Sequence, residues 1–177
     1  EAYLKSHAKV AYGSFGSMLD MDGDTIVVGQ NQDFILSTSI VNGPTVTNPT
    51  GSIATSGAAF IFRKVSGSWV QEAYLKAPNL EAADQFGVQV AISGDTVAVA
   101  ALTEDNSTTG VQNGSIVTDN SSAASSGAVY VFTRSGSTWS FQSYLKPAVV
   151  VASMTCGRTL DLDGDTIAVG CDGDASD

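Results

Sequence analysis

Few side chains in this sequence have the types and spacing that catalysis needs. His7 is the only histidine, so a Ser–His–Asp triad has one possible general base, and no Gly-x-Ser-x-Gly segment supplies a nucleophile elbow. The two cysteines and one histidine lack the spacing of zinc ligands, and no Gly-x-x-x-x-Gly-Lys phosphate loop is present. Carboxylates are abundant but lie at predicted turns rather than as a glycosidase pair. The sequence therefore predicts a protein that is not an enzyme.

Five aromatic side chains could act as platforms that stack on sugar rings. They are Trp69, Trp139, Tyr3, Tyr74 and Tyr144. Because they recur at a constant spacing within predicted strands, packing between sheets is the better interpretation of them.

Composition restricts the class of protein further. The 177 residues carry a net charge of −10, and 15% are charged while 43% are hydrophobic. An acidic chain lacks the basic surface that nucleic-acid binding needs, and no apolar run approaches the ~20 residues that span a bilayer. We expect neither a nucleic-acid partner nor a membrane span. Frequent Gly, Ser and Thr, without long helix-forming segments, favour an all-β fold.

An internal repeat organises the elements that carry these residues. Residues 1–5 (Glu-Ala-Tyr-Leu-Lys) recur at 72–76, and aligning 1–30 with 72–101 gives 12 identities. Phe15-Gly16 recurs as Phe86-Gly87, and the third counterpart is Cys156-Gly157. We therefore expect a single repeat array over 1–177, with repeats 1–71, 72–142 and a truncated 143–177.

Each repeat is expected to form four strands. The predicted strands cover 15–21, 25–30, 58–62 and 69–75, then 86–92, 96–101, 128–133 and 139–145. Asp22-Gly23 predicts a type I′ turn, and a second hairpin turns around Ser66-Gly67. Radial stacking would bury both faces of such sheets, so we predict β-propeller blades made of four-stranded antiparallel sheets, about two and a half in this chain. A β-sandwich or β-solenoid of the same hairpins is the alternative.

The pattern resembles bacterial FG-GAP repeats, which are relatives of the propeller blades of integrin alpha subunits. Two segments carry the resemblance, Phe86-Gly87 through Val99 and Ser126-Gly127-Ala128 through Phe132, and it extends over essentially the whole chain. The GAP half departs from the family pattern in every repeat. It reads Gly29-Gln30-Asn31, Ala100-Ala101-Leu102 and Gly170-Cys171-Asp172.

The resemblance implies a calcium loop in the first hairpin of a blade, and calcium takes six to eight oxygen ligands. The candidate ligands are Asp20, Asp22, Asp24, Asp161, Asp163 and Asp165. The middle repeat has Ala91 and Ser93 at the first two of these places. Turns that use Asp for backbone hydrogen bonds explain the pattern more simply, so we expect no cofactor, with calcium as the alternative.

Cys156 and Cys171 are predicted to form a disulfide. If Asp163-Gly164 is a two-residue hairpin loop, counting outward from it places the cysteines opposite each other, with Cα atoms ~5.5 Å apart. Two free thiols filling the space of a phenylalanine are the alternative. A disulfide indicates an oxidising compartment, so we expect an extracellular, cell-surface or periplasmic protein.

Two long connections, 31–56 and 102–126, each join the second and third strands of a repeat, so both are expected on one face of the array. Apolar residues inside them, Phe34-Ile35-Leu36, Ile40-Val41 and Ile116-Val117, predict that part of each is ordered and packs on a neighbouring blade or another chain.

We predict a secreted or cell-surface, non-enzymatic binding or adhesion module with a protein or glycan ligand at this face. The alternatives are a structural subunit of an extracellular assembly whose chains complete each other's propeller and a glycan-acting hydrolase. Two and a half blades would leave sheet faces open. Either the natural polypeptide therefore continues on at least one side, or several copies close the ring.

Overall fold

The computed structural model describes residues 2–6, 13–38, 40–45, 51–114 and 120–173. Within these ranges the chain forms strands and no helix, so no helix there could span a membrane. The strands are β1 (Met18–Asp22), β2 (Thr25–Gln30), β3 (Val41–Asn42), β4 (Ala58–Val65), β5 (Ser68–Leu75), β6 (Gln89–Ser93), β7 (Thr96–Ala101), β8 (Val111–Asn113), β9 (Ala128–Ser135), β10 (Thr138–Leu145), β11 (Thr159–Asp163) and β12 (Thr166–Gly170).

The strands form two five-stranded antiparallel sheets and one two-stranded hairpin. The sheet orders are β1-β2-β4-β5-β3 and β6-β7-β9-β10-β8, followed by β11-β12. We call the first sheet blade 1, the second blade 2, and β11–β12 the third hairpin. The four strands predicted for each of the first two repeats are confirmed. The fifth, β3 or β8, was missed, because its two or three residues lie inside a long polar connection and are too few to show a period.

The first hairpin of each repeat turns one residue later than predicted. Asp22 pairs with Thr25, so Gly23 and Asp24 are the central residues of the turn. Of these two residues, only Gly23 has a positive φ (55°). A type II′ turn needs a positive φ at its first central residue alone, whereas the predicted type I′ turn needs it at both. Around Ser66-Gly67 both φ angles are positive, at 49° and 84°, as in a type I′ turn.

The predicted first strands also begin too early. The Phe-Gly pairs precede β1 and β6, and Gly87 has a left-handed φ of 90° that ends the regular ladder. Its N–H donates to the Ala100 carbonyl at 2.9 Å, and Gly16 donates to Gly29 in the same way at 3.1 Å. The glycine thus forms an irregularity at the entry of each blade.

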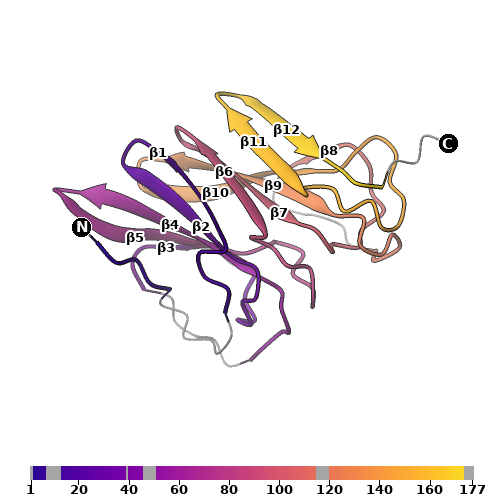
Figure 1. Ribbon diagram of the computed structural model, residues 1–177, viewed down its shortest axis with the longest axis horizontal. Coiled ribbons are helices and arrows are strands. Elements are labelled where there is room, and N and C mark those ends of the chain that lie inside the picture. Colours follow the sequence, from indigo (N-terminus) through magenta and orange to yellow (C-terminus); the bar gives the residue numbers. More distant parts are fainter. Residues whose placement is uncertain (1, 7–12, 39, 46–50, 115–119, 174–177) are drawn as a thin grey trace.

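Consecutive blades lie with their first strands side by side, so β1, β6 and β11 form a row (Figure 1). The main apolar cluster lies between blades 1 and 2 and contains Val27, Ile61, Val90, Ile92 and Trp139. Backbones approach closely at this junction. A Cβ built on Gly29 would lie 2.0 Å from the Gly87 carbonyl oxygen. The sheets therefore stack as propeller blades do.

Candidate functional site

A buried ion pair fixes the ends of the first long connection. Lys76 Nζ, just after β5, lies 3.0 Å from Asp33 Oδ1, and both side chains are fully buried. Tyr74 donates its hydroxyl to the same carboxylate oxygen at 2.8 Å. Lys76 also donates to Ser56 Oγ (2.9 Å) and to the Gly57 carbonyl (2.6 Å). Asp33 begins the connection and Ser56 ends it, so one ammonium group binds both ends to the last strand of blade 1.

Burial controls the protonation of this group of side chains. It lowers the pKa of Lys76, while the adjacent Asp33 carboxylate opposes that shift. Burial, with Asp33 as second cause, raises the pKa of the Tyr74 hydroxyl. Tyr74 is therefore a neutral hydrogen-bond donor at any ordinary pH.

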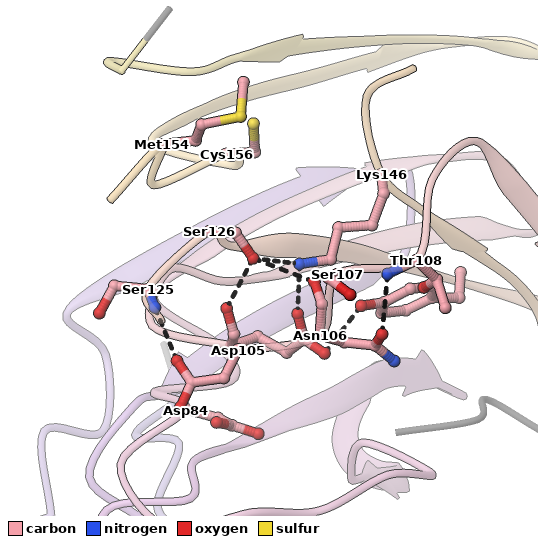
Figure 2. A network of polar contacts seen from close by, with 12 residues as sticks. Asp84, Asp105, Asn106, Ser107, Thr108, Ser125, Ser126, Lys146, Met154 and Cys156 are labelled. Carbon is pink, nitrogen blue, oxygen red and sulfur yellow. Dashed lines mark hydrogen bonds and ion pairs between the residues drawn. The ribbon is translucent and has the colours of Figure 1, made fainter. Parts of the chain in front are cut away.

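Blade 2 repeats the arrangement with a longer acid. Lys146 Nζ donates to Ser126 Oγ at 2.5 Å (Figure 2). The same ammonium nitrogen lies 2.6 Å from Glu104 Oε2. Tyr144 donates to Glu104 Oε1 at 2.7 Å, and Asn79 Nδ2 donates to the same oxygen at 3.1 Å. Both long connections are thus held at both ends by equivalent buried networks.

Sequence reasoning missed these networks, although a signal was present. Tyr-Leu-Lys recurs at 74–76 and 144–146, and Ser-Gly-Ala recurs at 56–58 and 126–128. A lysine that returns at the repeat spacing beside a packed tyrosine indicates a buried partner, because a lysine is seldom buried without one. The acids could not be found by identity, since one repeat uses Asp33 and the other Glu104.

A second acidic group lies where the linker between the blades meets the connection of blade 2. Asp84 is 1% exposed, and its Oδ1 has no hydrogen-bond partner within the described residues. Its Oδ2 accepts a hydrogen bond from the Glu81 N–H at 3.3 Å. Burial, then the carboxylates of Glu104, Glu81 and more weakly Asp105, raise the pKa of Asp84 to about 8. Asp84 and Asp105 lie near each other in Figure 2.

Two of the predicted calcium ligands join blade 1 to blade 2. Asp20 Oδ2 accepts a hydrogen bond from the Ile92 N–H at 2.8 Å, and Asp22 Oδ2 accepts one from the Gly94 N–H at 2.7 Å. In blade 2 the hydroxyl of Ser93 takes the second role and accepts from the Gly164 N–H at 3.0 Å. These side chains therefore connect the first strands of neighbouring blades.

The other predicted ligands lie on the third hairpin and at turn tips. Asp161 Oδ1 accepts from the Leu162 N–H at 3.0 Å, Asp163 is exposed at the end of β11, and Asp165 lies 3.4 Å from the Thr166 hydroxyl. Asp24 is exposed in its turn. In the described part of the chain, no three His, Cys, Asp or Glu side chains are grouped as a metal site would require. Calcium therefore stays a prediction from the resemblance.

The predicted disulfide is confirmed, but the register from which it was derived is wrong. Cys156 and Cys171 are bonded, with Cα atoms 4.0 Å apart. The hairpin pairs Asp163 with Thr166, so Gly164 is a central residue of the turn together with Asp165. Continued regularly, this ladder would not bring the cysteines opposite each other.

The glycine irregularity at the entry of β11 restores their alignment. Thr159 pairs with Gly170, and the Gly157 N–H also donates to the Gly170 carbonyl at 3.0 Å. Gly157 and Thr159 thus both lie opposite Gly170, so the segment before β11 contains extra residues relative to the end of β12. This shift in register places Cys156 beside Cys171.

Packing between sheets is confirmed for two of the five aromatic residues, Trp139 and Tyr144, which lie in the main apolar cluster. Tyr74 is buried in a second cluster made of residues of the first repeat, Trp69 is partly buried against that cluster, and Tyr3 is 83% exposed. Trp139 also holds the first long connection against blade 2. Its backbone N–H donates to Asn42 Oδ1 at 2.7 Å, and its carbonyl accepts from Asn42 Nδ2 at 3.1 Å.

The expected ordering of the long connections is confirmed for their described parts. Ile35 is buried and Ile40 packs against the main core. Ile116-Val117 lie outside the described residues, as does His7.

Comparison with known proteins gives one family match. Residues 69–132 match the family model of the FG-GAP repeat. The match extends from β5 into β9 and includes Phe86-Gly87. No curated protein and no solved structure matches the chain.

Proposed function

This chain is an FG-GAP repeat protein, and from that premise we propose that it is a secreted or cell-surface binding module without catalytic activity. One observation carries the proposal. Both long connections are fixed at their two ends by buried ion pairs, Lys76–Asp33 and Lys146–Glu104. Long loops on a rigid scaffold are a common means of ligand binding, because anchoring lowers the entropy lost when the ligand orders them.

The surface of these connections has the mixed character of a recognition site. Leu36 and Val111 are both exposed, at 47% and 62%, among Ser, Thr and Asn side chains. Val111 begins β8, an edge strand that offers backbone groups to an added strand. We propose a protein or glycan ligand on this long-connection surface. The disulfide between Cys156 and Cys171 supports an extracellular, cell-surface or periplasmic location.

The test is binding of the purified chain to a glycan array and to a panel of immobilised extracellular matrix proteins. Val111→Asp should weaken the binding found by at least about tenfold. Val65→Asp is the matched control, because Val65 is also an exposed valine (51%) but lies beside the hairpin turn at the opposite ends of the strands. Binding to neither panel, or an equal loss in the two variants, would overturn the proposal.

A further inference from the structure

Every asparagine of the second long connection begins an acceptor motif for N-linked glycans, which is Asn-x-Ser/Thr with any middle residue except proline. The three segments are Asn106-Ser107-Thr108, Asn113-Gly114-Ser115 and Asn120-Ser121-Ser122. In the first long connection, the one similar segment, Asn48-Pro49-Thr50, is excluded by its proline. The second of the three ends at Ser115, outside the described residues, so the structure compares the first with the third.

The first segment is closed to a modifying enzyme. Asn106 is completely buried, and its Oδ1 accepts a hydrogen bond from the Thr108 N–H at 2.9 Å. The Thr108 hydroxyl is buried as well. The carbonyl of Asn106 accepts from the hydroxyl of Ser126, to which Lys146 also donates (Figure 2). A glycan on Asn106 would therefore require the buried network of blade 2 to open.

The third segment has the same local turn but lies at the surface. Asn120, Ser121 and Ser122 are all exposed. The Ser122 N–H donates to Asn120 Oδ1 at 3.2 Å, which is the same bond that Thr108 makes to Asn106. The Ser122 hydroxyl also donates to the Asn120 carbonyl at 2.8 Å. The two segments thus share their local hydrogen bond and differ in exposure.

Contacts with the rest of the protein hold Asn120 by its side-chain oxygen. Besides the bond from Ser122, Oδ1 accepts from the N–H of Ser107 at 3.0 Å and from its hydroxyl at 3.1 Å. The Ser121 hydroxyl donates to the Glu81 carboxylate, in the linker between the blades, at 3.0 Å. Within the described residues, Nδ2 of Asn120 makes no hydrogen bond. The segment is therefore ordered on the surface, and the nitrogen to which a glycan is joined is not used in the fold.

We propose that Asn120 carries an N-linked glycan in the mature protein, a proposal that rests on the extracellular location proposed above. The donor is an oligosaccharide on a lipid-linked diphosphate. A bond forms between Asn120 Nδ2 and C1 of the first sugar, while the bond from C1 to the diphosphate oxygen breaks. The diphosphate leaves with the bonding electron pair, and the amide proton passes to a base of the transferase. The product is a bulky, water-soluble group that covers part of the second long connection.

Substitutions at two neighbouring serines separate the acceptor motif from the surface around it. Ser122→Ala removes the hydroxyl that the motif requires and keeps Asn120, so the glycan should be lost. Ser121→Ala changes the middle residue, which the motif leaves open, so the glycan should be kept although the contact with Glu81 is lost. Both serines are exposed, so both variants should fold, which circular dichroism verifies.

The measurement is peptide mapping of the wild-type chain and both variants, each purified from the native source organism. Peptide N-glycosidase in heavy-oxygen water converts a glycosylated asparagine into a labelled aspartate, which mass spectrometry locates. Asn120 should be labelled in the wild type and in Ser121→Ala, but not in Ser122→Ala. Asn106 should stay unlabelled in all three proteins. Alkylation of the same samples shows whether the disulfide between Cys156 and Cys171 has formed.

The disulfide distinguishes failure of this proposal from failure of the proposed location. An unlabelled Asn120 in a wild-type chain that contains the disulfide would overturn the glycan and leave the extracellular location standing. An unlabelled Asn120 together with two free thiols would overturn both. A label at Asn120 that persists in Ser122→Ala or disappears in Ser121→Ala would overturn the role of the motif, and a label at Asn106 in the folded chain would overturn the selection by exposure.

Discussion

Asp84 is a residue at which folding and protonation are coupled. Its pKa is raised to about 8 in the folded chain, by burial and then by the surrounding carboxylates, against ~3.9 in an unfolded chain. The folded state therefore binds the proton more tightly. The contribution of Asp84 to the free energy of unfolding is fully present below pH ~4 and is lost as the pH rises through about 8.

Asp84→Asn should remove this dependence, because an amide keeps the size of the protonated acid and cannot ionise. We expect the variant to exceed the wild type in free energy of unfolding by roughly 1–3 kcal/mol at pH 9, with the difference shrinking towards pH 5. Urea unfolding at both pH values measures it. Asp24→Asn, an exposed carboxylate, should leave the profile unchanged. Parallel wild-type and Asp84→Asn profiles would contradict the assignment.

Lys76 is expected to be required for stability, because its removal leaves the buried Asp33 carboxylate without a cation. Lys76→Met keeps much of the side-chain volume but strips Asp33 of its cation, at a cost of about 3–5 kcal/mol in the free energy of unfolding. Lys64→Met, on an exposed lysine of the same blade, should change it by less than about 0.5 kcal/mol. Chemical denaturation measures the free energy of unfolding of both variants and shows whether the Lys76 ion pair stabilises the fold. Equal stabilities would argue against the anchor.

At the scale of elements, the repeat alone predicted most strands but not how they are joined. Hydrophobic segments and Gly-Asp-Thr recurrences located eight strands of the two blades. The register failed at each first hairpin, because the sequence shows a glycine in the turn but not which turn position it takes. The Phe-Gly irregularity was missed for a related reason, since positive φ at Gly157 is a backbone property that no side-chain pattern reports.

Two constraints favour glycine at position 87: a left-handed φ and the close approach of a neighbouring backbone. Substitutions can separate their effects on stability. Gly87 and Gly16 have nearly equal φ values of 90° and 86°, but only Gly87 lies against another backbone, where a Cβ would approach the Ala58 oxygen to 2.1 Å. Gly16→Ala should therefore cost only the left-handed conformation, about 1–2 kcal/mol. Gly87→Ala should cost roughly 1–3 kcal/mol more, from overpacking. Thermal and urea unfolding at low concentration compare the two, and equal losses would refute a steric role at the blade junction.

At the scale of the whole molecule, the buried ion pairs bind both ends of each long connection to the strands of its blade. The sequence predicted connections that pack, from apolar residues such as Ile35. It did not predict the ion pairs at their ends, because Asp33 and Ser56 are 23 positions apart and meet Lys76 only in the folded blade.

The third hairpin differs from the two blades in what stabilises it, and this difference can be measured. It has two strands, β11 and β12, and most of its residues stay partly or fully exposed, whereas β7 and β9 are buried on both faces. The bond between Cys156 and Cys171 closes a 15-residue separation across it and should contribute up to about 3 kcal/mol. Alkylation before and after reduction should give no modified thiol and then two. Reduction should accelerate amide hydrogen exchange in β11–β12 while β7 and β9 stay protected, because local openings follow the least-packed element. Uniform acceleration through all three units would show instead that the hairpin unfolds together with the blades.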